Sequence, residues 1–60
     1  MTVYVNNNPV YLLPGMTVKN ALVQAGLLKN LDGHQRVYDE WGNEIGLGGA
    51  IYENMRIFVR

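Results

Sequence analysis

Apolar and polar residues alternate near the start of the chain, as they do in strands that bury one face. The alternation covers residues 2–6 and returns in residues 10–13, and the two segments are separated by two further asparagines and a proline. Asparagine tolerates the backbone of tight turns, and proline is suited to the first residue of a strand or to an edge. The pattern predicts an antiparallel hairpin. Its inward residues are Val3, Val5, Val10 and Leu12.

A helical spacing of apolar residues follows the hairpin. The apolar positions recur at intervals of three and four residues and comprise Val18, Ala21, Leu22 and Ala25. Thr17 is the expected N-cap, because its hydroxyl can accept a backbone N–H of the first turn. Gly26 suits the left-handed residue that ends many helices. We therefore predict one helix over residues 18–25, with Val23 at the margin of its apolar stripe.

The second half of the chain predicts short strands joined by turns. In order, we expect a loop at 29–35, a strand at 36–39, a turn at 40–43, a strand at 44–47, a bend and one 3₁₀ turn up to residue 55, and a last strand at 56–60. In the last strand, Ile57 and Val59 are expected to face inward. The expected core comprises Val3, Val5, Leu12, Val18, Leu22, Ile57 and Val59. The chain is thus predicted to be one α+β domain over residues 1–60, in the order β-β-α-β-β-β with a mixed sheet packed on one helix.

Composition narrows the possible functions. The chain has 60 residues and no cysteine, which excludes disulfides, Cys-ligated zinc and iron–sulfur clusters. Five basic residues balance five acidic ones and are scattered along the sequence, so the basic stripe typical of nucleic-acid binders is missing. No apolar run approaches the roughly 20 residues of a membrane span, and the start does not resemble a signal peptide. We expect a cytoplasmic domain without cofactor, nucleic acid or membrane as partner.

The order of elements, together with several short motifs, resembles the β-grasp fold of ubiquitin. The motifs are Val5-Asn6-Asn7, residues 13–18 (Leu-Pro-Gly-Met-Thr-Val), Ala21-Leu22, and Asp39, Gly42, Asn43 and Leu47 within residues 37–59. They are similar to those of the small bacterial ThiS/MoaD sulfur carriers, of TGS domains and of ferredoxin-like domains. The resemblance implies that the first and last strands are parallel neighbours in the centre of the sheet.

The same resemblance leaves two functions open. ThiS/MoaD carriers end in a free Gly-Gly whose carboxylate is adenylated, whereas Gly48-Gly49 of this chain is internal and residues 58–60 belong to the last predicted strand. Ferredoxin-like domains need four cysteines, and TGS domains belong to larger proteins. The first function is a small non-enzymatic protein-interaction module. The alternative is a sulfur-carrier or accessory protein of the ThiS/MoaD type whose Gly-Gly tail is lost or lies beyond residue 60.

Catalytic and phosphate-binding interpretations are weaker than structural ones. His34, the single histidine, lies two residues after Asp32, and a general-base pair is conceivable; a solvated loop histidine is the better interpretation. The glycines of residues 46–49 resemble a phosphate-binding turn, but neither a following Lys-Ser/Thr nor a helix start supports it. A bend between strands is preferred. We assign no catalytic or cofactor-binding residue and expect no enzyme.

The predicted turn at 40–43 offers two further candidates. Asp39, Glu40 and Glu44 are close enough in sequence to suggest a Ca²⁺ or Mg²⁺ site, although three carboxylates more often decorate an exposed turn. We assign no metal ligand. Trp41 is a large apolar side chain for a turn, and it either covers the core as a lid or marks a contact site.

The face of the sheet opposite the helix carries the main functional signal. Because successive residues of a strand point to opposite faces, inward valines place Tyr4, Tyr11 and Phe58 on the outer face. Arg56 and Arg60 are expected at the margin of these rings. Aromatic and arginine side chains are enriched at binding hot spots, whereas cross-strand ring pairs can also merely stabilise a sheet. We predict a solvent-facing patch that binds a protein partner or a second copy of the chain.

Overall fold

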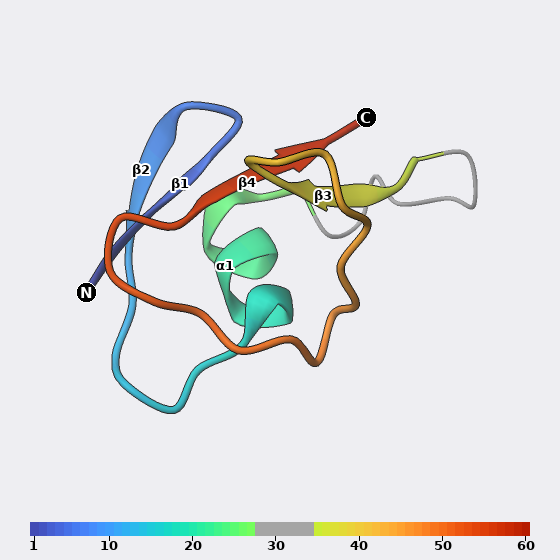
Figure 1. Ribbon diagram of the computed structural model, residues 1–60. Coiled ribbons are helices and arrows are strands. Elements are labelled where there is room, and N and C mark those ends of the chain that lie inside the picture. The colour runs from blue at the N-terminus through green and yellow to red at the C-terminus, as the bar shows by residue number, and fades with distance from the viewer. Residues whose placement is uncertain (28–34) are drawn as a thin grey trace.

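One helix and four strands make up the described part of this computed structural model, which covers residues 1–27 and 35–60 (Figure 1). The elements are β1 (Thr2–Val5), β2 (Asn8–Tyr11), α1 (Val18–Ala25), β3 (Val37–Asp39) and β4 (Arg56–Val59). The strands form one mixed sheet in the order β2-β1-β4-β3. The helix lies against one face of this sheet, so the chain is a two-layer α+β domain (Figure 1). The predicted loop at 29–35 lies, except for its last residue, outside the described residues.

The hairpin turns on two asparagines. Asn6 and Asn7 have φ angles of 49° and 70°, and Val5 pairs directly with Asn8. Two consecutive left-handed residues are what a two-residue turn of type I′ requires, and asparagine adopts them more readily than most residues. The predicted hairpin is confirmed. Its second strand begins two residues earlier than predicted, because the turn uses only two of the three asparagines.

Pro9 lies where the sheet needs no backbone donor. Leu12 N–H donates to the Met1 carbonyl at 2.7 Å, and the Met1 amino group donates back to the Leu12 carbonyl. Hydrogen-bonded and non-bonded pairs alternate in an antiparallel ladder. Pro9, which pairs with Tyr4, therefore falls at a non-bonded position, and its nitrogen faces the open side of β2.

The first and last strands pair in parallel at the centre of the sheet. Tyr4 N–H donates to the Met55 carbonyl and Asn6 N–H to the Ile57 carbonyl, each at 2.8 Å. The chain then enters the hairpin turn, and the Asn6 side-chain oxygen accepts the Val59 N–H at 3.0 Å. The Asn6 carboxamide thus adds one hydrogen bond to the ladder after the β1 backbone has turned away.

The helix begins and ends where predicted. At its start, the Asn20 side-chain oxygen accepts the Thr17 N–H at 2.9 Å and the Thr17 hydroxyl at 3.2 Å. At its end, Gly26 has a φ of 74° and its N–H donates to the Val23 carbonyl, while Leu27 N–H donates to the Leu22 carbonyl at 2.9 Å. These two bonds form a Schellman motif, which needs a left-handed residue and hence favours glycine.

Residues 46–49 bend around the start of the helix, and the strand predicted at 44–47 is not formed. Val18 N–H donates to the Gly49 carbonyl at 3.0 Å and Lys19 N–H to the Leu47 carbonyl at 2.9 Å. A β-carbon on Gly49 would lie 3.1 Å from the Gly46 carbonyl oxygen, a tight contact that favours glycine at this position. The strand predicted at 44–47 is therefore wrong, and one isolated bridge between Tyr38 and Glu44 takes its place.

The segment before β4 also differs from its prediction. A turn replaces the expected 3₁₀ turn: Asn54 has a φ of 64°, and Met55 N–H donates to the Tyr52 carbonyl at 3.1 Å. This turn carries Met55 into the core, where only 4% of its surface is exposed. The strand period carried a signal for this methionine, because Met55 lies two residues before the inward Ile57, but the strand predicted at 56–60 left it out.

The core lies between α1 and the sheet. Its buried side chains are Val3, Val5, Leu12, Val18, Ala21, Leu22, Val37, Met55 and Ile57. Six of the seven expected core residues are among them, and the seventh, Val59, is partly buried against the same cluster. Val23 is 54% exposed and lies outside the apolar stripe whose margin it was expected to occupy.

Replacing Leu22 with alanine should destabilise the domain strongly. Leu22 is fully buried, so Leu22→Ala should lower the free energy of unfolding by about 2–5 kcal/mol. The neighbouring Val23→Ala is the matched control and should change it by less than about 0.5 kcal/mol. Urea unfolding of both variants measures the difference. Equal midpoints for Leu22→Ala and the wild type would show that the helix packs through another face.

The Asn6 carboxamide can be separated from the Asn6 backbone by glycine substitutions. Asn6→Gly keeps the left-handed backbone but removes the acceptor of the Val59 N–H, and should cost about 1 kcal/mol. Asn7→Gly keeps the same turn geometry, and among residues 1–27 and 35–60 the Asn7 side chain makes no hydrogen bond, so it should cost much less. Thermal unfolding of the two variants tests this; equal losses would mean that the ladder does not depend on the carboxamide.

Candidate functional site

The outer face of the sheet, opposite α1, carries aromatic and arginine side chains from all four strands. The register pairs Tyr4 with Arg56 and Tyr38 with Phe58. Tyr11 lies on β2 opposite Thr2, and Arg60 follows β4. We call these six residues the outer patch: Tyr4, Tyr11, Tyr38, Arg56, Phe58 and Arg60. Five of them are the residues that the strand period places on this face, and the structure places all five there together with Tyr38.

The arginines of the outer patch lie over its rings. The Arg56 guanidinium carbon is 4.8 Å from the centre of the Tyr4 ring. The Arg60 carbon is 5.6 Å from the Tyr38 ring centre and 5.7 Å from that of Phe58. All three distances are within the range of cation–π attraction. The rings are therefore partly buried under guanidinium groups, and only Tyr11, at 73% exposed, is the open aromatic that the sequence predicted.

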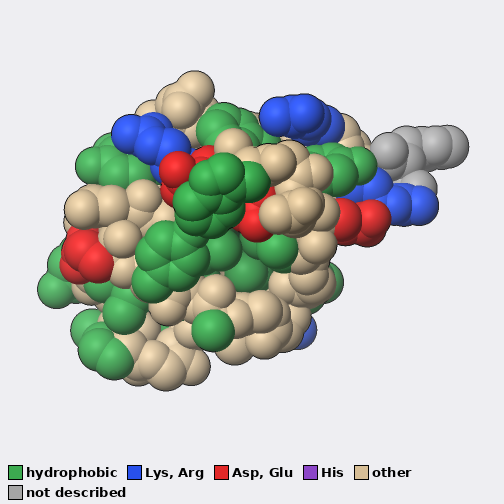
Figure 2. Space-filling model, in the orientation of Figure 1, with side chains coloured by type: hydrophobic (Ala, Val, Ile, Leu, Met, Phe, Trp, Pro, Cys, Tyr) green, Lys and Arg blue, Asp and Glu red, His purple; other side chains and the backbone are tan. Residues whose placement is uncertain are grey.

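The outer patch is positively charged. Arg56 and Arg60 are both exposed, and in the described part of the chain neither has a carboxylate within ion-pair distance. In Figure 2, basic side chains stand along the upper edge of the molecule with hydrophobic ones between them. The described ion pair joins Arg36 to Glu44 at 3.6 Å, with both side chains more than half exposed. Such a pair contributes little to stability.

Two features of this face were not predicted from the sequence: the position of Arg36 beside Arg60 and the outward direction of Tyr38. Arg36 N–H donates to the Arg60 carbonyl at 2.6 Å and Arg60 N–H to the Arg36 carbonyl at 2.9 Å, so these two arginines, which are far apart in sequence, lie side by side before β3 and after β4. Tyr38 was assigned to a strand but not to a face. The signal for its face was present, because Val37 is apolar and an inward Val37 turns Tyr38 outward.

The acidic residues near the turn at 40–43 do not converge on a common point. The Asp39 carboxylate accepts the N–H groups of Trp41 and Asn43 at 2.9 Å each, and Glu44 lies beside Arg36. Among residues 1–27 and 35–60, no group of three acidic or histidine side chains could hold a metal ion. The Asp39 side chain thus holds the turn together by accepting hydrogen bonds from the turn's backbone, as aspartate does in many turns.

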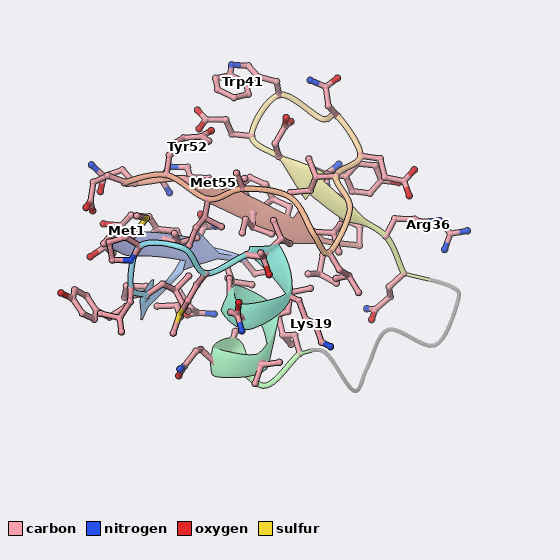
Figure 3. The ribbon with its side chains drawn as sticks, turned by 90° about the horizontal axis from the view of Figure 1, so that it is seen from below. Met1, Lys19, Arg36, Trp41, Tyr52 and Met55 are labelled. Atoms are coloured by element: carbon pink, nitrogen blue, oxygen red, sulfur yellow. The ribbon has the colours of Figure 1, made fainter. Side chains whose placement is uncertain are left out.

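Trp41 and Tyr52 lie beside these carboxylates. Trp41 is 69% exposed at the tip of the turn, so its interpretation as a lid on the core is wrong (Figure 3). Tyr52 lies on the same side of the molecule (Figure 3). The pKa of the Tyr52 hydroxyl is raised above its usual value, first by desolvation and then by the negative charges of Glu40 and Asp39. The hydroxyl therefore stays protonated at neutral pH and can donate a hydrogen bond.

The glycines of residues 46–49 do lie at a helix start, contrary to the sequence interpretation. They present carbonyl oxygens to it, however, and these already accept the N–H groups of Val18 and Lys19. An anion would need those same donors, so this geometry gives the segment a capping role rather than a phosphate site. The pair Asp32 and His34 lies outside the described residues.

Comparisons of the chain with protein-family models, with curated proteins and with solved structures gave no match. Within the two described ranges, no helix has the length and apolar character needed to cross a bilayer. The outer patch is thus the feature of the described residues that points to a function.

Removing the Asp39 carboxylate should loosen the turn whether or not a metal is present. Asp39→Ala deletes the acceptor of two backbone N–H groups and should lower the free energy of unfolding by about 1.5–3 kcal/mol. Glu40→Ala, in the same turn, is the matched control. Both variants are unfolded in urea with and without millimolar Ca²⁺. A loss that appears only with Ca²⁺ would instead identify Asp39 as a metal ligand.

Proposed function

We propose that this chain is a non-enzymatic binding domain that contacts a protein partner through the outer patch. The observation that carries the proposal is the placement of four aromatic rings and two arginines on one face, across all four strands. The helix covers the opposite face (Figure 1). A sheet face turned to solvent is normally polar, so rings in this position call for an explanation.

Sheet stabilisation explains only part of the outer patch. Tyr38 and Phe58 are directly opposite across β3 and β4, and such a pair stabilises a sheet. Tyr11 pairs with Thr2 and remains 73% exposed, so its ring adds little to cross-strand packing. Arginine and tyrosine are the residues that most often dominate binding energy at interfaces. A contact surface accounts for both observations.

The partner is a different protein rather than a second copy. A symmetric dimer formed through the outer patch would bring Arg56 and Arg60 of both copies to one interface. In the described residues neither arginine has a carboxylate partner that could offset this repulsion. Like charges placed opposite each other in a packed interface are destabilising.

The proposal includes a fold of the β-grasp type. Its support is the parallel pairing of the first and last strands in the centre of the sheet, with a hairpin leading into the helix. The resemblance to ubiquitin and its small bacterial relatives implied this arrangement, and it brings Tyr4 and Tyr11 onto one face with Phe58.

Phe58→Ala tests the proposed function. At a hot spot the substitution should weaken partner binding by about 2 kcal/mol or more. It should cost the fold less, since the ring lies outside the core between sheet and helix. Immobilised wild type, Phe58→Ala and Val23→Ala are compared for capture of proteins from a lysate of the source organism, followed by affinity measurements on the captured protein.

The control in this experiment is Val23, an exposed apolar residue on the helix, whose substitution should leave capture unchanged. Thermal unfolding of all three proteins accompanies the binding data. If Phe58→Ala unfolds the domain, or if it captures the same proteins as the wild type with equal affinity, the outer patch is structural and the proposal fails.

A further inference from the structure

We infer that the outer patch binds an extended acidic segment of its partner, with two carboxylates flanking an apolar side chain. This inference rests on the proposed function and adds the chemistry of the partner. The five residues of the segment that matter follow the pattern acidic–any–apolar–any–acidic. The segment lies along β4, with its carboxylates at Arg56 and Arg60 and its apolar side chain at Phe58.

Charge complementarity is the first argument. The chain has no net charge, with five basic and five acidic residues, yet its outer patch is basic. The strand residues facing outward are Thr2, Tyr4, Pro9, Tyr11, Tyr38, Arg56 and Phe58, and none of them is acidic. Glu44, which is bridged to Tyr38 and so lies on the same face, forms its ion pair with Arg36 and not with Arg56 or Arg60. Two guanidinium groups without a carboxylate partner in the described residues are best matched by carboxylates of another molecule.

The rings hold the guanidinium groups ready to bind. Arg56 lies over Tyr4, and Arg60 lies over both Tyr38 and Phe58. A guanidinium held over a ring keeps its N–H donors, and within the described residues neither Arg56 nor Arg60 uses them in an ion pair. A carboxylate can accept hydrogen bonds from two of these donors in parallel. Because the arginine side chains are already held, binding costs less conformational entropy than it would for free side chains.

The spacing along β4 sets the spacing in the partner. Arg56, Phe58 and Arg60 are alternate residues of one extended segment, so all three point outward. At about 3.3 Å per residue, the two arginines are roughly 13 Å apart along the strand. An extended peptide has the same rise and the same alternation. Its first, third and fifth residues therefore match the three side chains in order.

The size of the outer face also favours a short segment. Four strands at a spacing of about 4.8 Å, each about four residues long, present an area on the order of 300 Å² before side chains are counted. Stable interfaces between folded proteins bury about 800 Å² on each partner. A peptide of about five residues can be bound by this face alone, whereas a second copy or a rigid globular partner would also have to contact residues outside it.

Single-stranded nucleic acid fits the same face less well. Bases bind to sheet surfaces by stacking on exposed aromatic rings. Here the chain's own arginines lie over Tyr4, Tyr38 and Phe58, which leaves Tyr11 as the open ring of the patch. Carboxylates recognise the guanidinium groups without needing a ring face. An apolar side chain needs only the part of Phe58 that stays exposed, whereas a stacked base needs a whole ring face.

A peptide selection on the whole chain tests the inference. A random library of extended 12-residue peptides is displayed, selected on immobilised wild type, and the enriched peptides are measured against the wild type, R56Q, R60Q and the double variant R56K/R60K. Lys19→Gln is the matched control, because it removes one positive charge from the exposed helix layer (Figure 3). Amide NMR of the complex maps where each peptide binds.

Enriched peptides should carry two acidic residues four positions apart with an apolar residue between them. R56Q and R60Q should each weaken their binding about tenfold or more, because each loses a charge-assisted hydrogen-bonded pair. R56K/R60K should also bind more weakly, since lysine keeps the charge but cannot donate two parallel hydrogen bonds to one carboxylate. Binding should fall as salt is added, and Lys19→Gln should bind as the wild type does.

Other outcomes separate the two proposals. Neutral or basic peptides that map to the outer patch would overturn the acidic segment but support the proposed function. Peptides that map to the helix layer, or no enrichment at all, would overturn both. A uridine 15-mer that binds the patch more tightly than the best peptide, and loses binding in R56Q, would overturn both in favour of nucleic acid. Far-UV circular dichroism confirms that each variant is folded.

Discussion

The pairing of β1 with β4 is the contact on which the rest of the domain depends. It joins residues that are more than 50 positions apart, as in the bond between Asn6 and Val59. β3 reaches the sheet only through β4, so without this pairing the sheet would separate into two strand pairs. The outer patch would separate with it, because Tyr4 and Tyr11 belong to one pair and Tyr38 and Phe58 to the other. One pairing therefore supports both the fold and the surface on which the proposed function rests.

The parts of the fold that depend on local sequence were predicted correctly. The hairpin, the helix with Thr17 and Gly26 at its ends, and most of the core follow from alternation, helical spacing and turn residues. Residues 44–47 were predicted as a strand because their composition suits one. Their conformation is instead set by Val18 and Lys19, whose N–H groups bind carbonyls nearly 30 residues later. That contact has no local signal.

The candidate site shows the same division between local and distant information. The period of a strand was enough to place Tyr4, Tyr11, Arg56, Phe58 and Arg60 on one face. It could not show that the guanidinium groups lie over the rings, because this depends on the register between β1, β3 and β4 and on side-chain conformations. The stacking changes the chemistry of the surface, since a patch read as aromatic presents mainly hydrogen-bond donors.

The position of Pro9 decides how this sheet can be approached. An incoming strand that joined the β2 edge would find no N–H at the proline, and the β3 edge is already contacted by Glu44 and Ile45. Both edges thus resist strand addition, the route by which exposed sheets recruit peptides and also aggregate. Under the proposed function, recognition would thereby be directed to side chains on the face of the sheet, where discrimination between ligands depends on their chemistry rather than on a shared backbone pattern.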